Sequence, residues 1–465
     1  MSFNTDILLS LQNIVGTSYV FTDDETRKNY GHDETEDYNF PPQVVVKPKS
    51  PEEISAIMKL ASEHTIPVTP IGAKTGLSGG ALSIHGGIGL SMERFNSIIE
   101  VDDKNLQVIV EPGVITQVLK DAVAEKGLFY PVDPSSLGSC FIGGNIAENS
   151  GGARAVKYGV TKDYVLNLEV VLPNGEIIWT GANTLKNSTG YNLTQLMVGS
   201  EGTLGIITKI VLKLIPKVTH NILMLVPFYN AEQACEAVSA IFRAGIVPSA
   251  LEFMERDAID WTMRYVEGVS VPIKKEIQAH LLIEVDGNYP EVLFQEAEKI
   301  TEVLEQFEID EVLFADTEDQ KNALWKLRRA VGEAVKSNSV YKEEDTVVPR
   351  YALPILLKGV KDAGKKYGFH TICYGHAGDG NLHINIVKGD MSDENWSTEV
   401  PKGIVEIFEL TVQLKGTLSG EHGIGYVQKD YMSLAFNATQ LNLMKGIKKL
   451  FDPLGILNPG KILPE

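Results

Sequence analysis

The chain has 465 residues, of which 43% are hydrophobic, and this is enough to bury two or three cores. Its formal net charge of −19, with no basic cluster, excludes a protein that works by binding the nucleic-acid backbone. The three cysteines form no CxxC pair, so we expect neither an iron–sulfur cluster within this chain nor a disulfide framework. The first residues lack a signal-peptide pattern, and no apolar run is long enough to span a membrane. We therefore expect a cytoplasmic protein.

The segment 50–64 carries the start and stop signals of a helix. Ser50 is the predicted N-cap, Pro51 takes the first helical position, and Glu53 completes a capping box. Apolar residues then recur at spacings of three and four, which predicts one buried face. Pro67 ends the pattern, and a short strand leads from there into a glycine-rich loop.

Strands and helices alternate over the first ~215 residues, with a predicted strand at 106–112 and an amphipathic helix at 115–128. The pattern changes near Pro216, where glycine becomes rarer. Hydrophobic strands then alternate with long charged helices, which predicts a second, α+β domain whose helices cover one side of its sheet. The strands are at 221–229 and 280–287, and the helices are at 229–245 and 290–307. The irregular segment 451–462 is expected to pack back onto the first domain.

Three long loops, at 70–81, 133–159 and 198–207, are unusually rich in glycine. Glycine lets backbone amides approach a pyrophosphate closely, and neighbouring N–H groups then bind the anion. None of the loops is a GxGxxG that opens a helix or a GxxxxGK[ST], so neither a Rossmann nor a P-loop nucleotide site is indicated. One such loop is more often a plain turn, but three in one domain favour a large phosphate-bearing cofactor.

The stretch YGHAGDGNLHIN, residues 374–385, places two histidines seven residues apart. The glycine, aspartate and asparagine between them predict strand, tight turn and strand. A second stretch, SGEHGIGYVQK at 419–429, puts a glutamate and a histidine side by side between glycines. Two histidines and one carboxylate leave a position open on zinc, which favours a metal site over a purely structural hairpin. The predicted metal ligands are His376, His383 and Glu421, and His422 is the predicted base.

The three glycine loops resemble the flavin-binding segments of the vanillyl-alcohol oxidase / p-cresol methylhydroxylase (PCMH-type) superfamily, most closely its D-lactate dehydrogenase and glycolate oxidase FAD-subunit branch. The resemblance extends from about Tyr30 to Lys461. It implies an α+β fold: a PCMH-type FAD-binding domain of two α+β subdomains over 1–217, an α+β substrate (cap) domain with an antiparallel sheet over 218–425, and a C-terminal segment over 426–465 that returns to the FAD domain.

The resemblance also implies how FAD is held. The first loop would wrap the pyrophosphate, the second would line the flavin, Glu201 would lie near the adenosine half and Asn458 near the isoalloxazine. Lys74 stands where relatives with covalent flavin carry a histidine, so we expect non-covalent FAD; Phe141 and Ala153 depart from the usual residues but leave the glycine pattern intact. The implied FAD-binding residues are Pro70, Gly72, Ala73, Thr75, Gly76, Leu77, Ser78, Gly79, Gly80, Pro134, Gly138, Ser139, Gly143, Gly144, Asn149, Gly151, Gly152, Tyr158, Gly159, Glu201, Gly202, Ile207 and Asn458.

Related D-2-hydroxy-acid dehydrogenases use the matching His, His and Glu as metal ligands and the next His as the base. The resemblance therefore implies an FAD- and divalent-metal-dependent enzyme that oxidises a D-2-hydroxy acid to the 2-oxo acid, with hydride passing to flavin N5. Zinc suits these ligands, and manganese or iron are alternatives. By the same resemblance Arg328 binds the substrate carboxylate, and Arg350 is a weaker candidate on a loop beside the active site.

Relatives that act on D-2-hydroxyglutarate carry an extra lysine where this chain has Glu343, with Lys342 one position away. This favours a monocarboxylate such as D-lactate or glycolate. The alternatives are a D-2-hydroxyglutarate dehydrogenase, an FAD subunit of a multi-subunit glycolate oxidase and, well below these, an FAD-dependent ether-lipid transferase.

The electron acceptor is left open among an iron–sulfur subunit, an electron-transferring flavoprotein, a quinone and a cytochrome. Such an acceptor could bring the chain to the membrane periphery. A homodimer is the plain expectation for the oligomeric state.

Overall fold

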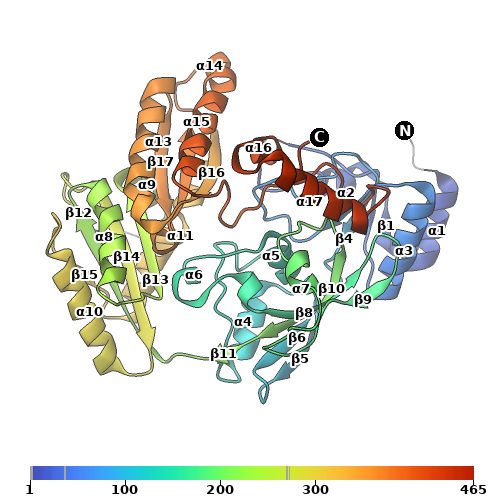
Figure 1. Ribbon diagram of the computed structural model, residues 1–465, viewed down its shortest axis with the longest axis horizontal. Helices are drawn as coiled ribbons and strands as arrows, with labels where there is room; N and C mark the ends of the chain where they lie inside the picture. The colour runs from blue at the N-terminus through green and yellow to red at the C-terminus, as the bar shows by residue number, and fades with distance from the viewer. Residues whose placement is uncertain (1–3, 36–37, 269–270, 272) are drawn as a thin grey trace. The chain divides into compact units, whose positions relative to one another are not determined.

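The computed structural model describes residues 4–35, 38–268, 271 and 273–465 (Figure 1). The chain divides into two compact units, and each is described here by itself. Unit 1 consists of Met1–Ser150, Val160–Lys217 and Glu421–Glu465, and unit 2 consists of Gly151–Gly159 and Val218–Gly420.

These units differ in two details from the domains expected from the sequence. The chain leaves unit 2 after Gly420 rather than after residue 425, and the short segment 151–159 belongs to unit 2 although both of its flanks belong to unit 1.

The first sheet of unit 1 has four strands, β1 (Val20–Phe21), β2 (Val44–Val46), β3 (Val68–Ile71) and β4 (Ile88–Ser91), in the order β1-β2-β4-β3. Strands β2 and β3 are parallel to β4, and β1 is antiparallel to β2. The accompanying helices are α1 (Thr5–Val15), α2 (Asp24–Asn29) and α3 (Pro51–His64).

Helix α3 confirms the helix predicted at 50–64. The Ser50 hydroxyl accepts a hydrogen bond from the Glu53 N–H at 3.3 Å, as predicted. The Glu53 carboxylate accepts from the Lys49 N–H at 2.8 Å, one residue before the position that the predicted capping box requires. The predicted apolar face is buried in one core with α1 and this sheet.

The second sheet of unit 1 is antiparallel, in the order β5-β6-β10-β8-β9. Its strands are β5 (Ile98–Asp102), β6 (Gln107–Val110), β8 (Val165–Val171), β9 (Ile177–Trp179) and β10 (Ile206–Lys213). Beside it lie α4 (Thr116–Ala124), α5 (Ile142–Glu148), α7 (Leu193–Met197) and the short pair β7 (Leu128–Phe129) and β11 (Ile215–Pro216). The strand predicted at 106–112 and the helix predicted at 115–128 are thus confirmed as β6 and α4, and both contribute to one core.

The end of the chain, from Glu421 to Glu465, belongs to unit 1. It contains α16 (Met432–Ala435) and α17 (Ala438–Phe451), drawn in red in Figure 1. Lys448 of α17 donates hydrogen bonds to the carbonyls of Thr203 and Leu457, at 2.8 and 2.7 Å. Leu457 also forms a parallel bridge with Val68 at the start of β3. The irregular tail therefore extends the first sheet.

Unit 2 is built on a seven-stranded antiparallel sheet in the order β15-β12-β14-β13-β17-β18-β16. The strands are β12 (His220–Phe228), β13 (Ala250–Glu255), β14 (Ala279–Gly287), β15 (Leu313–Phe314), β16 (Tyr341–Val347), β17 (His370–Gly375) and β18 (Asn381–Val387). Its helices are α6 (Ala155–Tyr158), α8 (Ala231–Arg243), α9 (Arg256–Tyr265), α10 (Pro290–Leu304), α11 (Glu318–Arg329), α12 (Val331–Lys336), α13 (Leu353–Tyr367), α14 (Asp393–Thr398) and α15 (Val400–Gln413).

Helices cover both faces of this sheet, so the expectation of helices on one side was wrong. Helices α9, α11 and α12 share a core with Ile372 of β17. Lys361 of α13 instead donates to the Thr371 hydroxyl at 3.0 Å, and neighbouring residues of a strand point to opposite faces. Helix α13 in turn contacts α8 and α15. The strands alternate too little in polarity for sequence to reveal the second layer, because both faces are buried.

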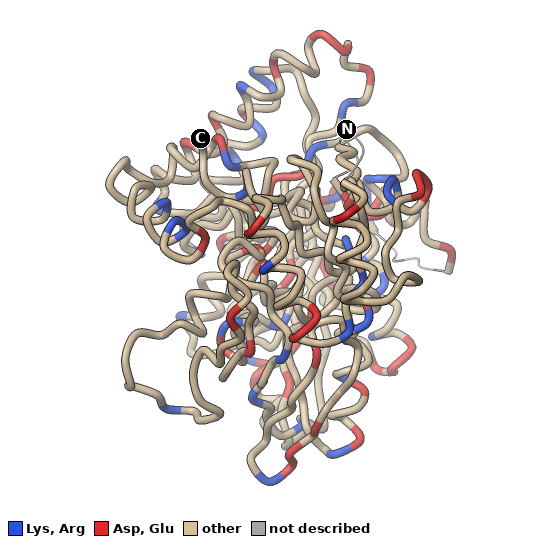
Figure 2. The backbone as a smooth tube through the Cα atoms, turned by 90° about the vertical axis from the view of Figure 1, so that its right-hand side faces the viewer, with Lys and Arg blue, Asp and Glu red and all other residues tan. Residues whose placement is uncertain are grey.

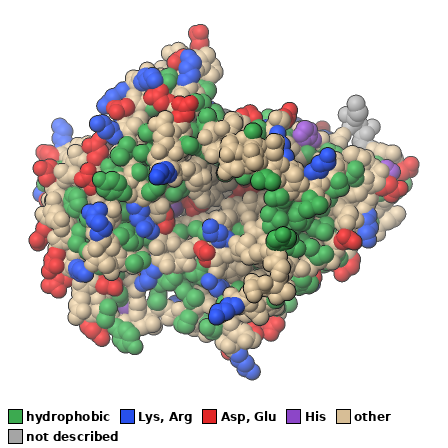
Figure 3. All heavy atoms as spheres, in the orientation of Figure 1, with side chains coloured by type: hydrophobic (Ala, Val, Ile, Leu, Met, Phe, Trp, Pro, Cys, Tyr) green, Lys and Arg blue, Asp and Glu red, His purple; other side chains and the backbone are tan. Residues whose placement is uncertain are grey.

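Charges of both signs are spread along the chain. Figure 2 shows basic and acidic residues interspersed along the backbone, and the face in Figure 3 mixes them in the same way. Among the described residues, no helix combines the length and the apolar character that crossing a bilayer requires. The three cysteines are all buried and unpaired.

The fold predicts an acid-sensitive step at His280 of β14. This imidazole is buried, and burial lowers its pKa to about 4. The unfolded chain protonates it near the ordinary value of 6.5, so the stability that the neutral ring provides is lost as pH falls from 6.5 toward 4. We expect the loss to reach about 3 kcal/mol, and His280→Leu to remove it. Urea unfolding at pH 6.5 and at pH 4 measures this loss of unfolding free energy. If His280→Leu and the exposed control His64→Leu lose equal stability on acidification, the prediction is wrong.

Candidate functional site

One face of the unit 2 sheet carries a row of polar side chains. The register pairs Tyr374 of β17 with His383 of β18, and His383 with Asp345 of β16. Directly paired residues point to the same face, so these three side chains share it. Met254 of β13 pairs with Tyr374 from the other side, so Glu252, two residues before Met254, also points this way. Four adjacent strands thus place ionisable or hydroxyl groups in one row.

Glu252, which is fully buried, contacts both His376 and Arg328. Each of its carboxylate oxygens lies 2.9 Å from Nδ1 of His376, and Oε2 lies 2.7 Å from Nη2 of Arg328. Burial by itself raises the pKa of the Glu252 carboxyl, but His376 and Arg328 outweigh this, and the net pKa is lowered. The carboxylate is therefore held in its ionised form.

His383 lies beside two carboxyl groups and two rings. Its Nδ1 is 3.5 Å from Oε1 of Glu343 and 3.7 Å from Oδ1 of Asp345. Its ring centroid is 5.1 Å from that of Tyr374, with the planes 30° apart, and 5.3 Å from that of His376, with the planes 81° apart. The two imidazoles predicted to bind a metal therefore lie edge to face within the same unit.

The predicted strand, turn and strand at 374–385 is confirmed. Strand β17 ends at Gly375, a 3₁₀ turn covers Ala377–Asp379, and β18 starts at Asn381. Gly380 has a φ of +78°, and a Cβ at this position would lie 1.9 Å from the carbonyl oxygen of Val348. The positive φ and the lack of room for a Cβ both require glycine at this position. The tight turn brings the two histidines back to the same end of the sheet.

The second histidine-bearing stretch is anchored to this row through Asp345, whose side chain is fully buried. Its Oδ2 accepts hydrogen bonds from the Ser419 hydroxyl at 3.1 Å and from the Gly420 N–H at 2.9 Å. Glu421 follows Gly420 directly, and consecutive Cα atoms are about 3.8 Å apart. Chain connectivity alone therefore keeps Glu421 close to a residue that pairs with His383.

The same stretch is held from its other end by Glu201. The carboxylate of this buried residue accepts the N–H groups of Ile424 and Gly425 at 2.8 and 2.7 Å. Burial raises the pKa of Glu201 to about 7, although the two N–H groups lower it. Glu421, His422 and Gly423 thus form a short link between two anchored ends. That Glu201 also lies near the adenosine half of FAD stays a prediction.

Arg328 lies in the last turn of α11 and points inward, whereas its neighbour Arg329 is exposed and lies over the Trp325 ring at 5.1 Å. The prediction that the two arginines take different faces is confirmed. The single helix expected over 325–334 is instead two, because α11 ends at Arg329 and α12 begins after Ala330. Arg328 is only 4% exposed, and its Nε has no hydrogen-bond partner among the described residues.

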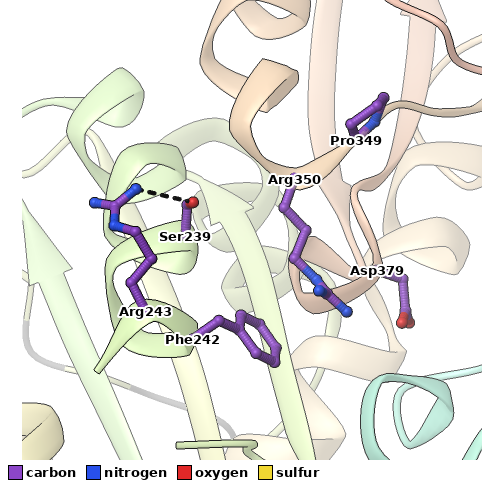
Figure 4. Close-up of a pocket in the computed structure, with 6 residues that line it drawn as sticks. All are labelled: Ser239, Phe242, Arg243, Pro349, Arg350 and Asp379. Carbon is purple, nitrogen blue, oxygen red and sulfur yellow. Dashed lines mark hydrogen bonds between the residues drawn. The ribbon is translucent and has the colours of Figure 1, made fainter. Parts of the chain in front are cut away.

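Arg350, the second predicted arginine, lies elsewhere in unit 2. Its Nε donates to the carbonyl of Gly378, and its guanidinium lies 4.1 Å from the centre of the Phe242 ring. Figure 4 shows it in a surface depression of about 480 Å³ whose described lining includes none of the residues in the polar row. The lining residues are Ser239, Phe242, Arg243, Pro349, Arg350 and Asp379. A role for Arg350 in catalysis stays a prediction.

Several glycines of the predicted cofactor loops face open space. A Cβ added at Gly72, Gly76 or Gly144 would meet no described atom within 4 Å, and none of the three has a positive φ. Neither the backbone nor a protein neighbour therefore requires glycine at these half-buried positions. By contrast Gly143 packs on Pro112, where a Cβ would come within 2.6 Å. The open glycines leave room for a bound group.

Asn458 and Tyr158 hold other parts of these loops. Asn458 Nδ2 donates to the carbonyls of Gly80 and Glu201, at 3.0 and 2.8 Å, and so joins the first and third loops within unit 1. The Tyr158 hydroxyl instead donates to the carboxylate of Asp286 on β14, at 2.8 and 2.9 Å. The end of the second loop is thus fastened to the unit 2 sheet, and contact of Tyr158 with the flavin stays a prediction.

Two family models match the chain. "FAD binding domain" matches residues 42–181, and "FAD linked oxidases, C-terminal domain" matches residues 217–462. The chain belongs to the FAD-linked oxidases.

This FAD-linked oxidase is similar over nearly its whole length to proteins of several names. It is 40% identical to glycolate oxidase subunit GlcD of Bacillus subtilis, covering 94% of this chain and 92% of the relative. It is 41% identical to D-lactate dehydrogenase of Anaerostipes hadrus, covering 95% and 94%. It is 32% identical to D-2-hydroxyglutarate dehydrogenase of Stutzerimonas stutzeri, covering 97% of each.

Solved structures share the fold of this oxidase. p-Cresol methylhydroxylase with substrate bound aligns with a TM-score of 0.77 at 18% identity, covering 98% of this chain and 96% of the other. The expected PCMH-type α+β fold is therefore confirmed. The open glycines of unit 1 fit the FAD that this domain binds, since they lie in the loops predicted to receive it.

Sequence reasoning missed Glu252 and Tyr374 as members of the polar row. Tyr374 stands within the quoted stretch, and its strand position relative to the turn could have placed it there. Glu252 lies in ALEFME, which reads as a buried strand, and an acidic residue inside such a strand is the signal that was available. Asn385 was also missed: it is fully buried two residues after His383, on the same face.

Filling the open glycines should remove FAD without unfolding the chain. We expect Gly76→Val and Gly144→Val to purify folded but colourless, because the added Cβ meets no described protein atom and the side chain occupies space predicted for the ligand. Flavin absorbance and far-UV circular dichroism measure the two properties separately. Gly446→Ala on exposed α17 is the control and should stay yellow. Yellow Gly76→Val and Gly144→Val proteins would contradict the assignment of these loops.

Proposed function

We propose that this chain oxidises a small D-2-hydroxy acid, with D-lactate or glycolate favoured, to the 2-oxo acid. The observation that supports this best is the buried row of unit 2, in which two imidazoles and a tyrosine lie on one face of the sheet and the guanidinium of Arg328 lies over the tyrosine ring. A carboxylate with a neighbouring hydroxyl offers the charges and hydrogen bonds that such a row can satisfy. The names of the relatives, D-lactate dehydrogenase and glycolate oxidase subunit, agree with this class of substrate.

Arg328 binds the substrate carboxylate in this proposal. One edge of its guanidinium faces Glu252, and its buried Nε keeps a donor for a ligand. A guanidinium is the side chain best suited to a planar, bidentate contact with a carboxylate. Asn385 and the Tyr374 hydroxyl, both on the same face, are the further polar groups proposed to orient the substrate.

His376, His383 and Glu421 would hold a divalent metal, with zinc preferred and manganese or iron as alternatives. The two imidazoles fit this role because their rings are 5.3 Å apart and Glu252 faces Nδ1 of His376, so Nε2 would be the ligand. Glu421 fits because it follows the anchored Gly420. When bound, such an ion supplies Lewis acidity that lowers the pKa of the substrate hydroxyl.

His422 would take the hydroxyl proton, since an imidazole titrates near working pH. The hydrogen on C2 then leaves with both electrons of its bond, and bound FAD supplies the two-electron acceptor at N5. The alcohol carbon thereby becomes a carbonyl, and the acid has lost one proton and one hydride. The buried sheet face serves this step by excluding water from the charged groups.

Glu343 supports a substrate with one carboxylate. Its Oε1 lies 3.5 Å from His383 Nδ1 and 3.4 Å from the Tyr374 hydroxyl, so a carboxylate already stands beside the row. Burial raises the pKa of Tyr374, and the charge of Glu343 raises it further, which keeps the phenol protonated as a donor. A second substrate carboxylate near Glu343 would be repelled.

Two other functions stay as alternatives. The similarity to a D-2-hydroxyglutarate dehydrogenase supports the dicarboxylate as substrate, and the name glycolate oxidase subunit supports an FAD subunit that works with partners. We place the chain in the cytoplasm, where the acceptor is an iron–sulfur subunit or an electron-transferring flavoprotein, with quinone and cytochrome as the other candidates. The ether-lipid transferase ranks below these, since an alignment at 18% identity with alkyldihydroxyacetonephosphate synthase reflects the fold alone.

An anaerobic titration tests the reaction. D-lactate or glycolate should bleach the visible flavin absorbance of the purified protein, and L-lactate should not. His422→Asn should keep FAD but slow bleaching by about 10²–10⁴-fold, because the base is lost. Prior treatment with a chelator should slow it as well, and added zinc or manganese should restore it. The exposed His85→Asn is the control. A yellow protein that no hydroxy acid reduces would overturn the proposed function.

Reversing the charge at Glu343 tests the choice of substrate. We expect Glu343→Lys to raise kcat/KM for D-2-hydroxyglutarate by about tenfold or more relative to D-lactate, since repulsion of the second carboxylate becomes attraction. Lys342→Gln is the matched control, because the preceding residue of β16 points to the opposite face. A wild-type preference for D-2-hydroxyglutarate would contradict the monocarboxylate assignment directly.

A further inference from the structure

We propose that Glu252 is a positioning residue that fixes the metal-binding His376 and the substrate-binding Arg328 with one carboxylate. This inference rests on the proposed function and adds a residue that the sequence motifs do not contain. It makes metal binding and substrate-carboxylate binding depend on the same buried anchor.

The strand register delivers Glu252 to His376. Phe253 of β13 pairs with Gly375 of β17, so the next antiparallel step sets Glu252 opposite His376. Both carboxylate oxygens lie 2.9 Å from Nδ1, and an ionised carboxylate can only accept a hydrogen bond. Nδ1 therefore carries the proton, and the lone pair of the ring belongs to Nε2. A carboxylate behind a ligating histidine fixes the tautomer and the ring direction in this way.

The same carboxylate orients Arg328. Its Oε2 lies 2.7 Å from Nη2 of Arg328, and both residues are almost completely buried. A buried guanidinium without a counter-charge is strongly unfavourable, so Glu252 allows Arg328 to stay ionised inside the unit before any substrate arrives. The Arg328 guanidinium also lies 5.0 Å from the centre of the Tyr374 ring, which limits its rotation. Glu252 thus determines which edge of the guanidinium is left for a ligand.

Sharing one anchor has a measurable consequence. If Glu252 only stabilised the sheet, its loss would lower the unfolding temperature but would leave zinc affinity and KM unchanged in the folded protein. If it positions both groups, its loss weakens metal affinity through His376 and raises KM for the hydroxy acid through Arg328. Outer carboxylates behind ligating histidines typically account for about 10–100-fold in metal affinity.

The test compares Glu252→Ala, Glu252→Gln and the control Glu255→Gln in the FAD-loaded full chain. Glu255 is buried on the same strand three residues later, with its carboxylate 2.7 Å from Lys361 Nζ, on the face away from the polar row. The readouts are zinc affinity by chelator competition, KM and kcat for D-lactate, and thermal unfolding. Flavin absorbance reports folding, and Glu252→Gln, which keeps the side-chain size, serves if Glu252→Ala does not fold.

We expect Glu252→Ala to weaken zinc binding by about 10-fold or more and to raise KM, while Glu255→Gln changes neither. Glu252→Gln should recover part of one property only, because a single amide cannot accept from His376 and neutralise Arg328 together. Zinc affinity and KM within twofold of wild type in both Glu252 variants would overturn the inference and leave the proposed function standing. A wild-type protein that neither binds a divalent metal nor is reduced by a hydroxy acid would overturn both.

Discussion

The antiparallel pairing of β13, β17, β18 and β16 is the constraint on which the candidate site depends. The side chains of a strand alternate between faces, so a slip of one residue would send His383 and Tyr374 to the opposite side. The turn at Gly380 prevents such a slip, because any side chain there would collide with the carbonyl of Val348. A backbone requirement at one glycine thereby sets the positions of the polar side chains of the row on three strands.

The electrostatics of the row follow from its burial. Glu252, Glu343 and Asp345 bring three carboxyl groups to one face, where Arg328 pairs with Glu252 and His383 lies beside the other two. In a region of low dielectric such a surplus of acidic groups is unfavourable unless protons or cations compensate it. The divalent cation of the proposed function would provide such compensation. In that proposal the two imidazoles would supply nitrogen ligands, which suit zinc better than magnesium or calcium.

Sequence reasoning succeeded where a local rule carried the information. The N-cap residue Ser50 and the proline after it predicted α3, and the glycine and asparagine residues at 378–381 predicted the turn between the histidines. It failed where the information was tertiary. The helices on the second face of the unit 2 sheet were not predicted, because a strand that is buried on both faces shows no polar alternation in its sequence. Glu252 was not predicted because its partners are 76 and 124 positions away along the chain, and only strand order brings them together.

The path of the chain limits which parts of this enzyme can be expressed separately. It passes between the two units four times, at 150 to 151, 159 to 160, 217 to 218 and 420 to 421. The segment 151–159 is fastened inside unit 2 by Lys157 and Tyr158, both of which bind Asp286. Expression of residues 218–420 alone would therefore omit a piece of that unit and expose a buried aspartate. For the same reason, any single contiguous gene fragment that contains the whole of unit 2 also carries residues 160–217 of unit 1.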